Sequence, residues 1–201
     1  MNSRVLVLLL ACVLGCSRGG SSVDPIRRTH YASGQLWSEG REEAGQRFGT
    51  WTTWYPDGSQ KSLETFEAGK LGGPASAWWP DQEARFEGAF RIGRPDGLWK
   101  RFYRGGVPLS EGHFELGRKI GLWRNWYPNG QLQLEAEYDP AGAPGDGLIQ
   151  RFLEDGTPQS QGRLEGGLRS GPWRQWNKDG AIDPDHSGVF VGGRREGPLA
   201  D

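Results

Sequence analysis

The sequence predicts an all-β fold, an elongated antiparallel meander of β-hairpins that repeats about every 24 residues. Three observations predict it. A glycine recurs at near-constant steps, aromatic residues follow that glycine at fixed distances, and turn-forming residues separate runs in which polar and apolar residues alternate. This alternation has the period of two that belongs to β-strands, and the chain after residue 16 shows no helical spacing of apolar residues.

The glycine that opens each repeat sets the register of the array. The steps between successive glycines are 24, 24, 24, 26, 24 and 26 residues, for the positions Gly49, Gly73, Gly97, Gly121, Gly147, Gly171 and Gly197. Such regular steps are typical of a repeat protein, in which each unit buries its apolar side chains against its neighbours.

Aromatic side chains fill three further columns of the repeat. The second, fifth and sixth positions after the opening glycine together hold nine of the 10 tryptophans, and only Trp37 lies elsewhere. The columns read Trp51, Trp99, Trp123 and Trp173 at the second position, Trp54, Trp78, Phe102, Trp126, Phe152 and Trp176 at the fifth, and Tyr55, Trp79, Tyr103 and Tyr127 at the sixth. Repetition therefore explains why 201 residues include 33 Gly and 10 Trp.

Residues 1–15 are predicted to be a lipoprotein signal peptide. Arg4 supplies a positive charge, and residues 5–14 form an apolar run too short to span a bilayer as a permanent helix. The run ends in Val-Leu-Gly-Cys at residues 13–16, which resembles the lipobox of bacterial lipoproteins. The resemblance implies that Cys16 becomes the first residue of the mature protein and carries lipid, including palmitate.

Residues 16–29 are predicted to comprise the lipidated cysteine and a flexible tether, because they are rich in Gly and Ser and have no periodic apolar residues. Cys12 lies in the segment to be removed, so no thiol follows Cys16 and the mature chain cannot form an internal disulfide. The alternative to lipidation is an ordinary secretory signal, cut near Gly19 or Ser21.

Residues 30–201 are predicted to form the repeat domain. In each module an aromatic run meets a turn signal such as Asp57-Gly58 or Asn129-Gly130, whose residues tolerate the positive φ angles of a hairpin turn. A second glycine turn precedes the opening glycine by four residues in most modules. The exception is the loop at residues 139–145, which is two residues longer and has the place of an insertion in a repeat array.

The repeated motifs resemble the MORN-repeat variant family. The best matches are Gly-Thr-Trp-Thr-Thr-Trp-Tyr at residues 49–55 and Tyr-Pro-Asn-Gly-Gln-Leu at residues 127–132, and the resemblance extends over residues 30–201. It implies a β-hairpin array associated with protein scaffolding or membrane attachment, and many bacterial members are described as YwqK-family antitoxins. Two modules depart from the pattern. Ala75, Ile149 and Leu153 interrupt the aromatic columns, and Gln82 stands in place of the turn glycine.

The sequence favours no enzymatic, metal, cofactor or nucleic-acid chemistry. The formal net charge is -1 with no basic block, which argues against nucleic acid as a partner. His30, His113 and His186 fall in different columns and have no mature cysteine beside them, so no metal site is expected. The chain has no nucleophile elbow and no glycine-rich phosphate loop in a strand-to-helix context.

A column of glutamates has two interpretations. An ordered row of carboxylates could bind cations or basic peptides, or it could pair with arginines of neighbouring strands on a solvated face. Copying of the column into successive repeats favours the pairing, since a catalytic residue is normally unique. The column comprises Glu39, Glu87, Glu111 and Glu135.

The tryptophans also have two interpretations. They could stack on each other as the core of a single-layer sheet, or one row could stay exposed and bind a protein segment, a cell-wall glycan or a lipid headgroup. We expect one of the two sheet faces to be exposed enough to bind. The candidate aromatic surface comprises Trp51, Trp54, Trp99, Trp123, Trp126, Trp173 and Trp176.

Taken together, these patterns predict a non-enzymatic bacterial envelope lipoprotein that presents an extended β-repeat surface to an unknown protein partner. Lipid on Cys16 would attach it to a membrane. Ser17 follows the cysteine and no Asp does, which by the sorting rule of such lipoproteins indicates the outer membrane, facing the periplasm or the cell surface. The alternatives are a glycan- or peptidoglycan-binding module and an antitoxin-like neutraliser of a partner toxin.

Overall fold

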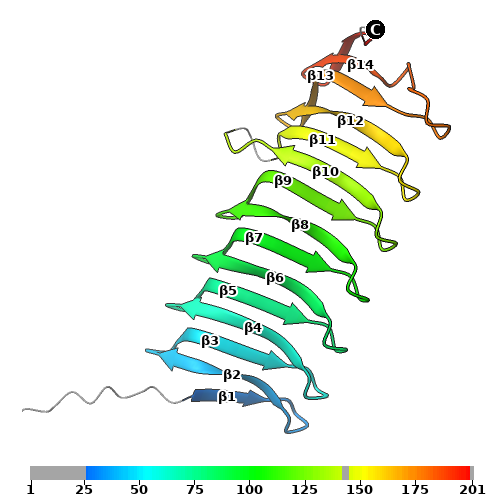
Figure 1. Cartoon of the computed structure of the whole chain (residues 1–201). Coiled ribbons are helices and arrows are strands. Elements are labelled where there is room, and N and C mark those ends of the chain that lie inside the picture. The colour runs from blue at the N-terminus through cyan, green and yellow to red at the C-terminus, as the bar shows by residue number, and fades with distance from the viewer. Residues whose placement is uncertain (1–25, 142–144, 200–201) are drawn as a thin grey trace, which may run out of the picture.

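The computed structural model describes residues 26–141 and 145–199, and the predicted signal peptide and Cys16 lie outside them. The described residues form one open sheet of 15 antiparallel strands in sequence order, and no helix (Figure 1). This confirms the predicted all-β meander of hairpins. The strands are β1 (Ile26–His30), β2 (Leu36–Glu43), β3 (Gln46–Trp54), β4 (Gln60–Glu67), β5 (Lys70–Trp78), β6 (Ala84–Arg91), β7 (Arg94–Phe102), β8 (Pro108–Glu115), β9 (Arg118–Trp126), β10 (Leu132–Tyr138), β11 (Gly147–Phe152), β12 (Pro158–Glu165), β13 (Leu168–Gln175), β14 (Gly188–Val191) and β15 (Arg194–Gly197).

The sheet begins earlier than the sequence pattern indicates. Strand β1 pairs Ile26 with Arg41 and Arg28 with Glu39 of β2, so residues 26–29, which the sequence assigned to the tether, belong to the sheet. Within the described ranges no helix is long and apolar enough to cross a membrane.

Two kinds of turn alternate along the sheet. The tight ones are two-residue turns in which both residues have positive φ, as at Ala44 (48°) and Gly45 (77°), which is the geometry that matches the twist of a hairpin. Asp57-Gly58 lies in a hairpin turn between β3 and β4, as the sequence predicts, but this turn is wider and only Gly58 of the two has positive φ. The Asp57 carboxylate instead accepts a hydrogen bond from the Ser59 amide at 2.9 Å.

The same arrangement recurs in the other wide turns. The Asn129 side chain accepts from the Gln131 amide at 2.9 Å, and the Asp155 carboxylate accepts from the Thr157 amide at 2.8 Å. Hydrogen bonds from Ser59 and Thr157 hold the pKa of Asp57 and of Asp155 below the ordinary value. These acidic residues therefore shape the backbone, as the turn chemistry predicts.

The core lies on one face of the sheet, here called the aromatic face. The second-position tryptophans are its centre, with exposed fractions of 2% for Trp51, 4% for Trp99, 3% for Trp123 and 2% for Trp173. Each indole covers a glycine of the preceding strand, where a β-carbon would fall within 2.1 to 2.5 Å of the ring, at Gly40, Gly88, Gly112 and Gly162. A single-layer sheet can bury tryptophan in this way because the missing side chain makes room for the ring.

The modules that break the tryptophan column also break the glycine column. Glu64 stands where the glycine would be, and its cross-strand neighbour is Ala75; likewise Ala136 pairs with Ile149. The two columns therefore change together, since a large ring and a side chain cannot share the space.

Tyrosines of the wide turns join successive modules. The Tyr31 hydroxyl donates to the Trp54 carbonyl at 2.8 Å, and Tyr103 donates to the Trp126 carbonyl at 3.0 Å. Tyr55 and Tyr127 repeat this bond to residues 78 and 152. The sixth-position tyrosines thus fix the spacing between one hairpin and the next.

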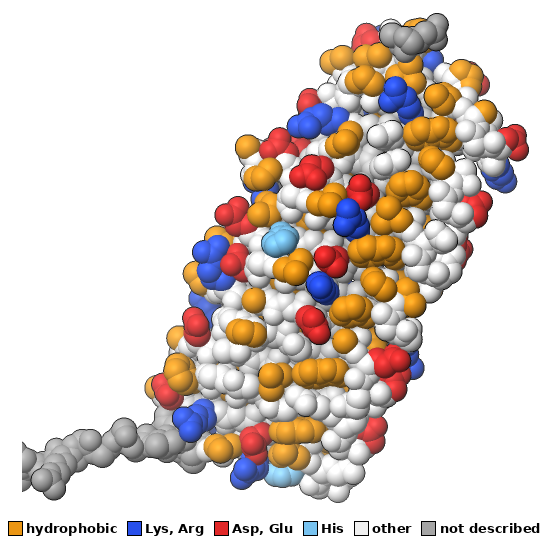
Figure 2. Space-filling view, in the orientation of Figure 1, with side chains coloured by type: hydrophobic (Ala, Val, Ile, Leu, Met, Phe, Trp, Pro, Cys, Tyr) orange, Lys and Arg blue, Asp and Glu red, His pale blue; other side chains and the backbone are white. Residues whose placement is uncertain are grey.

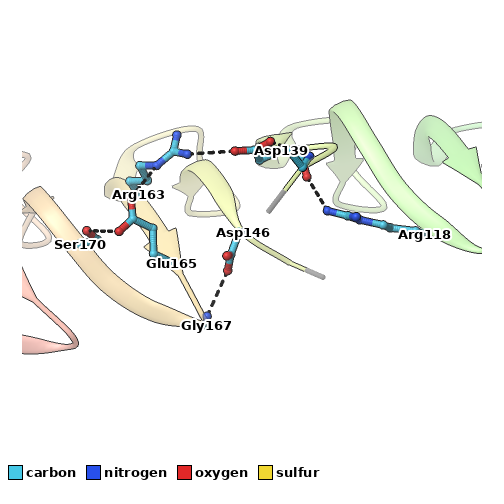
Figure 3. A network of polar contacts seen from close by, with 8 residues as sticks. Arg118, Asp139, Asp146, Arg163, Glu165, Gly167 and Ser170 are labelled. Atoms are coloured by element: carbon cyan, nitrogen blue, oxygen red, sulfur yellow. Dashed lines mark hydrogen bonds and ion pairs between the residues drawn. The ribbon is translucent and has the colours of Figure 1, made fainter. Parts of the chain in front are cut away.

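The long loop between β10 and β11 is held by a polar network (Figure 3). Arg118 donates to the Asp139 carbonyl at 2.8 Å, and Arg163 lies 3.3 Å from the Asp139 carboxylate. On the other side of the loop the buried Asp146 carboxylate accepts from the Gly167 amide at 3.2 Å. The insertion is therefore tied to the two neighbouring hairpins, and the sheet continues through it.

Candidate functional site

The aromatic face carries a ladder of tryptophan and phenylalanine rings. Trp51 meets Phe66 with ring centroids 6.3 Å apart, and Phe114 contacts Trp99 at 6.0 Å and Trp123 at 4.7 Å, all edge-on. Edge-to-face packing at these distances is favourable for aromatic pairs. The sequence analysis missed this phenylalanine column, although its signal is present: Phe66, Phe90 and Phe114 recur at steps of 24 residues.

Cationic side chains cover most of the ladder. The Arg47 guanidinium lies 4.3 Å from the Trp51 ring centroid, Lys119 Nζ lies 4.4 Å from Trp123, and Arg169 lies 4.8 Å from Trp173. All three occupy the position two residues before the opening glycine of their module. Each is a cation–π contact that also shields the ring from solvent.

Burial lowers the pKa of the Lys119 ammonium, and the nearby positive charge of Arg101 lowers it further. Positive charge therefore accumulates on this part of the aromatic face.

Trp99 is as buried as the other three, with 4% of its surface exposed, but no cation from the position two before the opening glycine lies over its ring. The residue two before Gly97 is Pro95, which has no charged side chain to lay over the ring. A groove of about 440 Å³ opens there across β6, β7 and β8. We call it the β6–β8 groove; it is lined by Trp79, Arg85, Phe86, Phe90, Pro95, Trp99, Arg101, Phe102 and Leu109.

The walls of the groove are mainly aromatic. Phe90 meets Trp99 edge-on at 5.0 Å between centroids, and Phe86 stacks on Trp99 at 5.5 Å with an interplanar angle of 19°. Phe86 occupies the column that holds the buried Ser62 and Ser110 in neighbouring modules. Two departures from the repeat, Pro95 and Phe86, therefore make this module different from the others.

Arginines stand at the edge of the groove. The guanidinium carbons of Arg85 and Arg104 lie 5.3 and 5.4 Å from the Trp79 ring centroid, and that of Arg101 lies 5.9 Å from Trp99. All three arginines are exposed. Among the residues that the structure describes, none of the three forms an ion pair, and no carboxylate lines the groove.

Trp79 occupies the column of the joining tyrosines, and its indole Nε1 is buried without a hydrogen-bond partner. It therefore cannot be assigned the tyrosine's joining role.

The seven tryptophans of the predicted surface do not form one continuous surface. All four second-position tryptophans are buried: cations lie over Trp51, Trp123 and Trp173, whereas Trp99 packs against phenylalanines and lines the β6–β8 groove. The fifth-position residues Trp54, Trp126 and Trp176 are half-buried. The structure thus singles out Trp99 and adds Trp79, Phe86 and Phe90, which the sequence analysis did not place in a site.

The glutamate column pairs with basic residues. Arg28 lies 2.5 Å from the Glu39 carboxylate, and Arg124 lies 2.8 Å from that of Glu135. Glu111 is the direct cross-strand neighbour of Lys100 and of Arg124. Figure 2 shows acidic and basic side chains alternating along the middle of one face of the sheet. This favours the pairing interpretation of the column over a row of free carboxylates.

The histidines stay apart, as their columns predict. His186 bonds to the Asp183 carboxylate at 2.7 Å, whereas the His113 carbonyl accepts the Trp123 indole N–H at 2.9 Å. In residues 26–141 and 145–199, no cluster of three or more His, Cys, Asp or Glu side chains could hold a metal ion.

This geometry defines a β-hairpin repeat protein. In the described residues, the β6–β8 groove opens on its aromatic face. The family model described as MORN repeat variant matches residues 95–115 and 119–139, which are two adjacent repeats. They correspond to the hairpins β7–β8 and β9–β10, so the first match includes part of the groove. A comparison with curated proteins finds no match to this chain.

Proposed function

We propose that this protein is a non-enzymatic lipoprotein of the bacterial cell envelope that binds a partner protein through the β6–β8 groove. The observation that carries the proposal is the aromatic groove that opens beside Trp99. Three equivalent tryptophans are capped by Arg47, Lys119 and Arg169, but at the fourth Pro95 leaves an aromatic groove open.

The groove has the size and composition of a recognition site. Its volume of about 440 Å³ falls in the range of ligand pockets, and its walls combine aromatic rings with a few charged groups. Tryptophan and arginine are the residues that most often carry the binding energy of a protein interface. MORN repeats in general are associated with scaffolding and membrane attachment, which agrees with a binding role.

The predicted signal peptide and Cys16 are the features that support a location in the cell envelope. Lipid on Cys16 holds the chain at a membrane, and the short tether after it leaves the sheet free to meet a partner. Ser17 directs the protein to the outer membrane by the sorting rule for such lipoproteins.

Site-specific photo-crosslinking in the native host tests the binding role. A photo-reactive phenylalanine analogue replaces Leu109 in the groove, and in a matched control it replaces the exposed Leu122. We expect one envelope protein to be captured from position 109 only, and to be lost when Pro95→Lys restores the missing cap. Capture of cell-wall fragments instead would overturn the proposal and favour glycan binding. Capture of a toxin encoded beside this protein would identify the partner and make it a neutraliser.

A further inference from the structure

The charge of the β6–β8 groove indicates the chemistry of its partner. Arg85 and Arg101 line the groove, and Arg104 lies beside them over Trp79. Some arginine side chains elsewhere in the sheet have carboxylate partners, such as Arg28 with Glu39 and Arg124 with Glu135. The groove arginines make only ring contacts in the described part of the chain, so their hydrogen-bond donors face solvent.

The neighbouring charges do not neutralise these arginines. Arg101 lies close enough to Lys119 to help lower the pKa of that ammonium group. The Glu83 carboxylate accepts the amide N–H of Gly105, the residue after Arg104, and is held in that turn. An anionic ligand would therefore meet uncompensated positive charge beside an apolar surface.

The groove, with a volume of about 440 Å³, has room for a side chain. Its lining combines the apolar residues Phe86, Phe90, Pro95 and Trp99 with Arg85 of β6 and Arg101 of β7. A bilayer surface would instead call for several basic residues spread over a wide area. The net charge of -1 and the paired charges of the opposite face do not supply them.

Resting on the proposed function, we infer that the partner segment is an extended acidic peptide. It inserts one aromatic side chain against Phe90 and Trp99, and its flanking carboxylates pair with Arg85 and Arg101. Arginine suits this role because its planar fork binds a carboxylate through two parallel hydrogen bonds.

Three fluorescently labelled peptides test this inference by anisotropy against the purified full chain. The first carries the core Asp-Glu-Phe-Asp-Glu, the second replaces its acids by Asn and Gln, and the third replaces its Phe by Ala. We expect saturable binding of the first, and at least about tenfold weaker binding of each of the others. Affinity for the first should also fall as salt rises from about 50 to about 300 mM, because screening becomes strong over roughly this range.

Paired variants locate the interaction. Arg85→Gln with Arg101→Gln should weaken binding of the acidic peptide by about tenfold or more, while Arg124→Gln on the opposite face should leave it unchanged. Circular dichroism checks that each variant keeps the sheet. If the acidic and neutral peptides bind alike, or if the paired variant binds normally, the inferred chemistry is wrong. Stronger binding to vesicles of phosphatidylglycerol and phosphatidylcholine than to the acidic peptide would also overturn it.

The failure of this inference can be told from the failure of the proposed function. A protein captured at position 109 that lacks an acidic segment would leave the binding role intact and refute the acidic partner. Absence of any protein captured there would count against both.

Discussion

Trp123 lies so close to Gly112 on the neighbouring strand that a β-carbon at position 112 would fall 2.2 Å from the indole ring. The indole N–H then donates to the carbonyl of His113 at 2.9 Å, so both the ring and its polar edge are accommodated by the same strand. The close approach recurs at Gly40, Gly88 and Gly162. The indole N–H bond recurs for Trp51 and Trp99, whereas that of Trp173 has no partner in the described residues.

We therefore expect Gly112→Ala to destabilise the array, because Trp123 must move off its site. Overpacking of this kind costs about 1–3 kcal/mol. Urea denaturation followed by tryptophan fluorescence measures the loss. The double variant Gly112→Ala with Trp123→Ile copies the pair Ala136 and Ile149, so it should recover part of the stability. Equal stability of wild type and Gly112→Ala would contradict the packing argument.

The tyrosine that joins successive hairpins gives a second prediction. Tyr103→Phe removes the hydroxyl that donates to the Trp126 carbonyl at 3.0 Å and leaves the ring in place. We expect a loss of about 0.5–1.5 kcal/mol in unfolding free energy, the usual contribution of one such bond. Hydrogen exchange should show the loss in the turns around residues 103 and 126, with the far strands unchanged. A uniform change along the whole sheet would count against a local joining role.

The ammonium group of Lys119 gives a prediction on pH. Its pKa is lowered from 10.5, first by burial and then by Arg101, so the folded chain releases this proton at a lower pH than the unfolded chain does. Between those two values the unfolded chain binds more protons, and the contribution of this group to stability rises with pH. NMR titration of the Lys119 side chain should give a pKa below 10.5.

In Arg101→Gln the same pKa should move part of the way back and remain lowered, because burial is the larger cause. A pKa that returns fully to 10.5 would show that charge, and not burial, dominates.

Membrane attachment gives a fourth prediction. Cys16→Ala removes the thiol that would carry the lipid. We expect the protein to leave the membrane fraction and to lose incorporation of labelled palmitate in cells. Cys12→Ala, inside the segment to be cleaved, should change neither result. An unaltered membrane fraction in Cys16→Ala would contradict attachment through this residue, and a wild-type protein found in the soluble fraction would favour the ordinary secretory signal.

Most of the fold could be predicted because its rules are local and repeated. Each of these rules acts over a few positions and recurs in every repeat: the opening glycine, the alternation of polar and apolar residues within strands, and the turn residues. The hairpin turns were predicted, but not the difference between the wide and the tight ones. Asp57 and Asn129 accept hydrogen bonds from the backbone two residues on, whereas positive φ at both turn residues belongs to the tight turns such as Ala44-Gly45.

The sequence by itself determined the repeat, its register and the strand order, because neighbouring hairpins pair in the order in which the chain makes them. Only the tertiary structure decided what covers each tryptophan. Arg47 lies over Trp51, whereas Trp99 is buried against Phe86 and Phe90 of the adjoining strand and lines the groove. These contacts depend on side chains from different strands that share one face of the sheet. The repeat columns show that such residues exist, and the twist and packing of the sheet decide which of them touch.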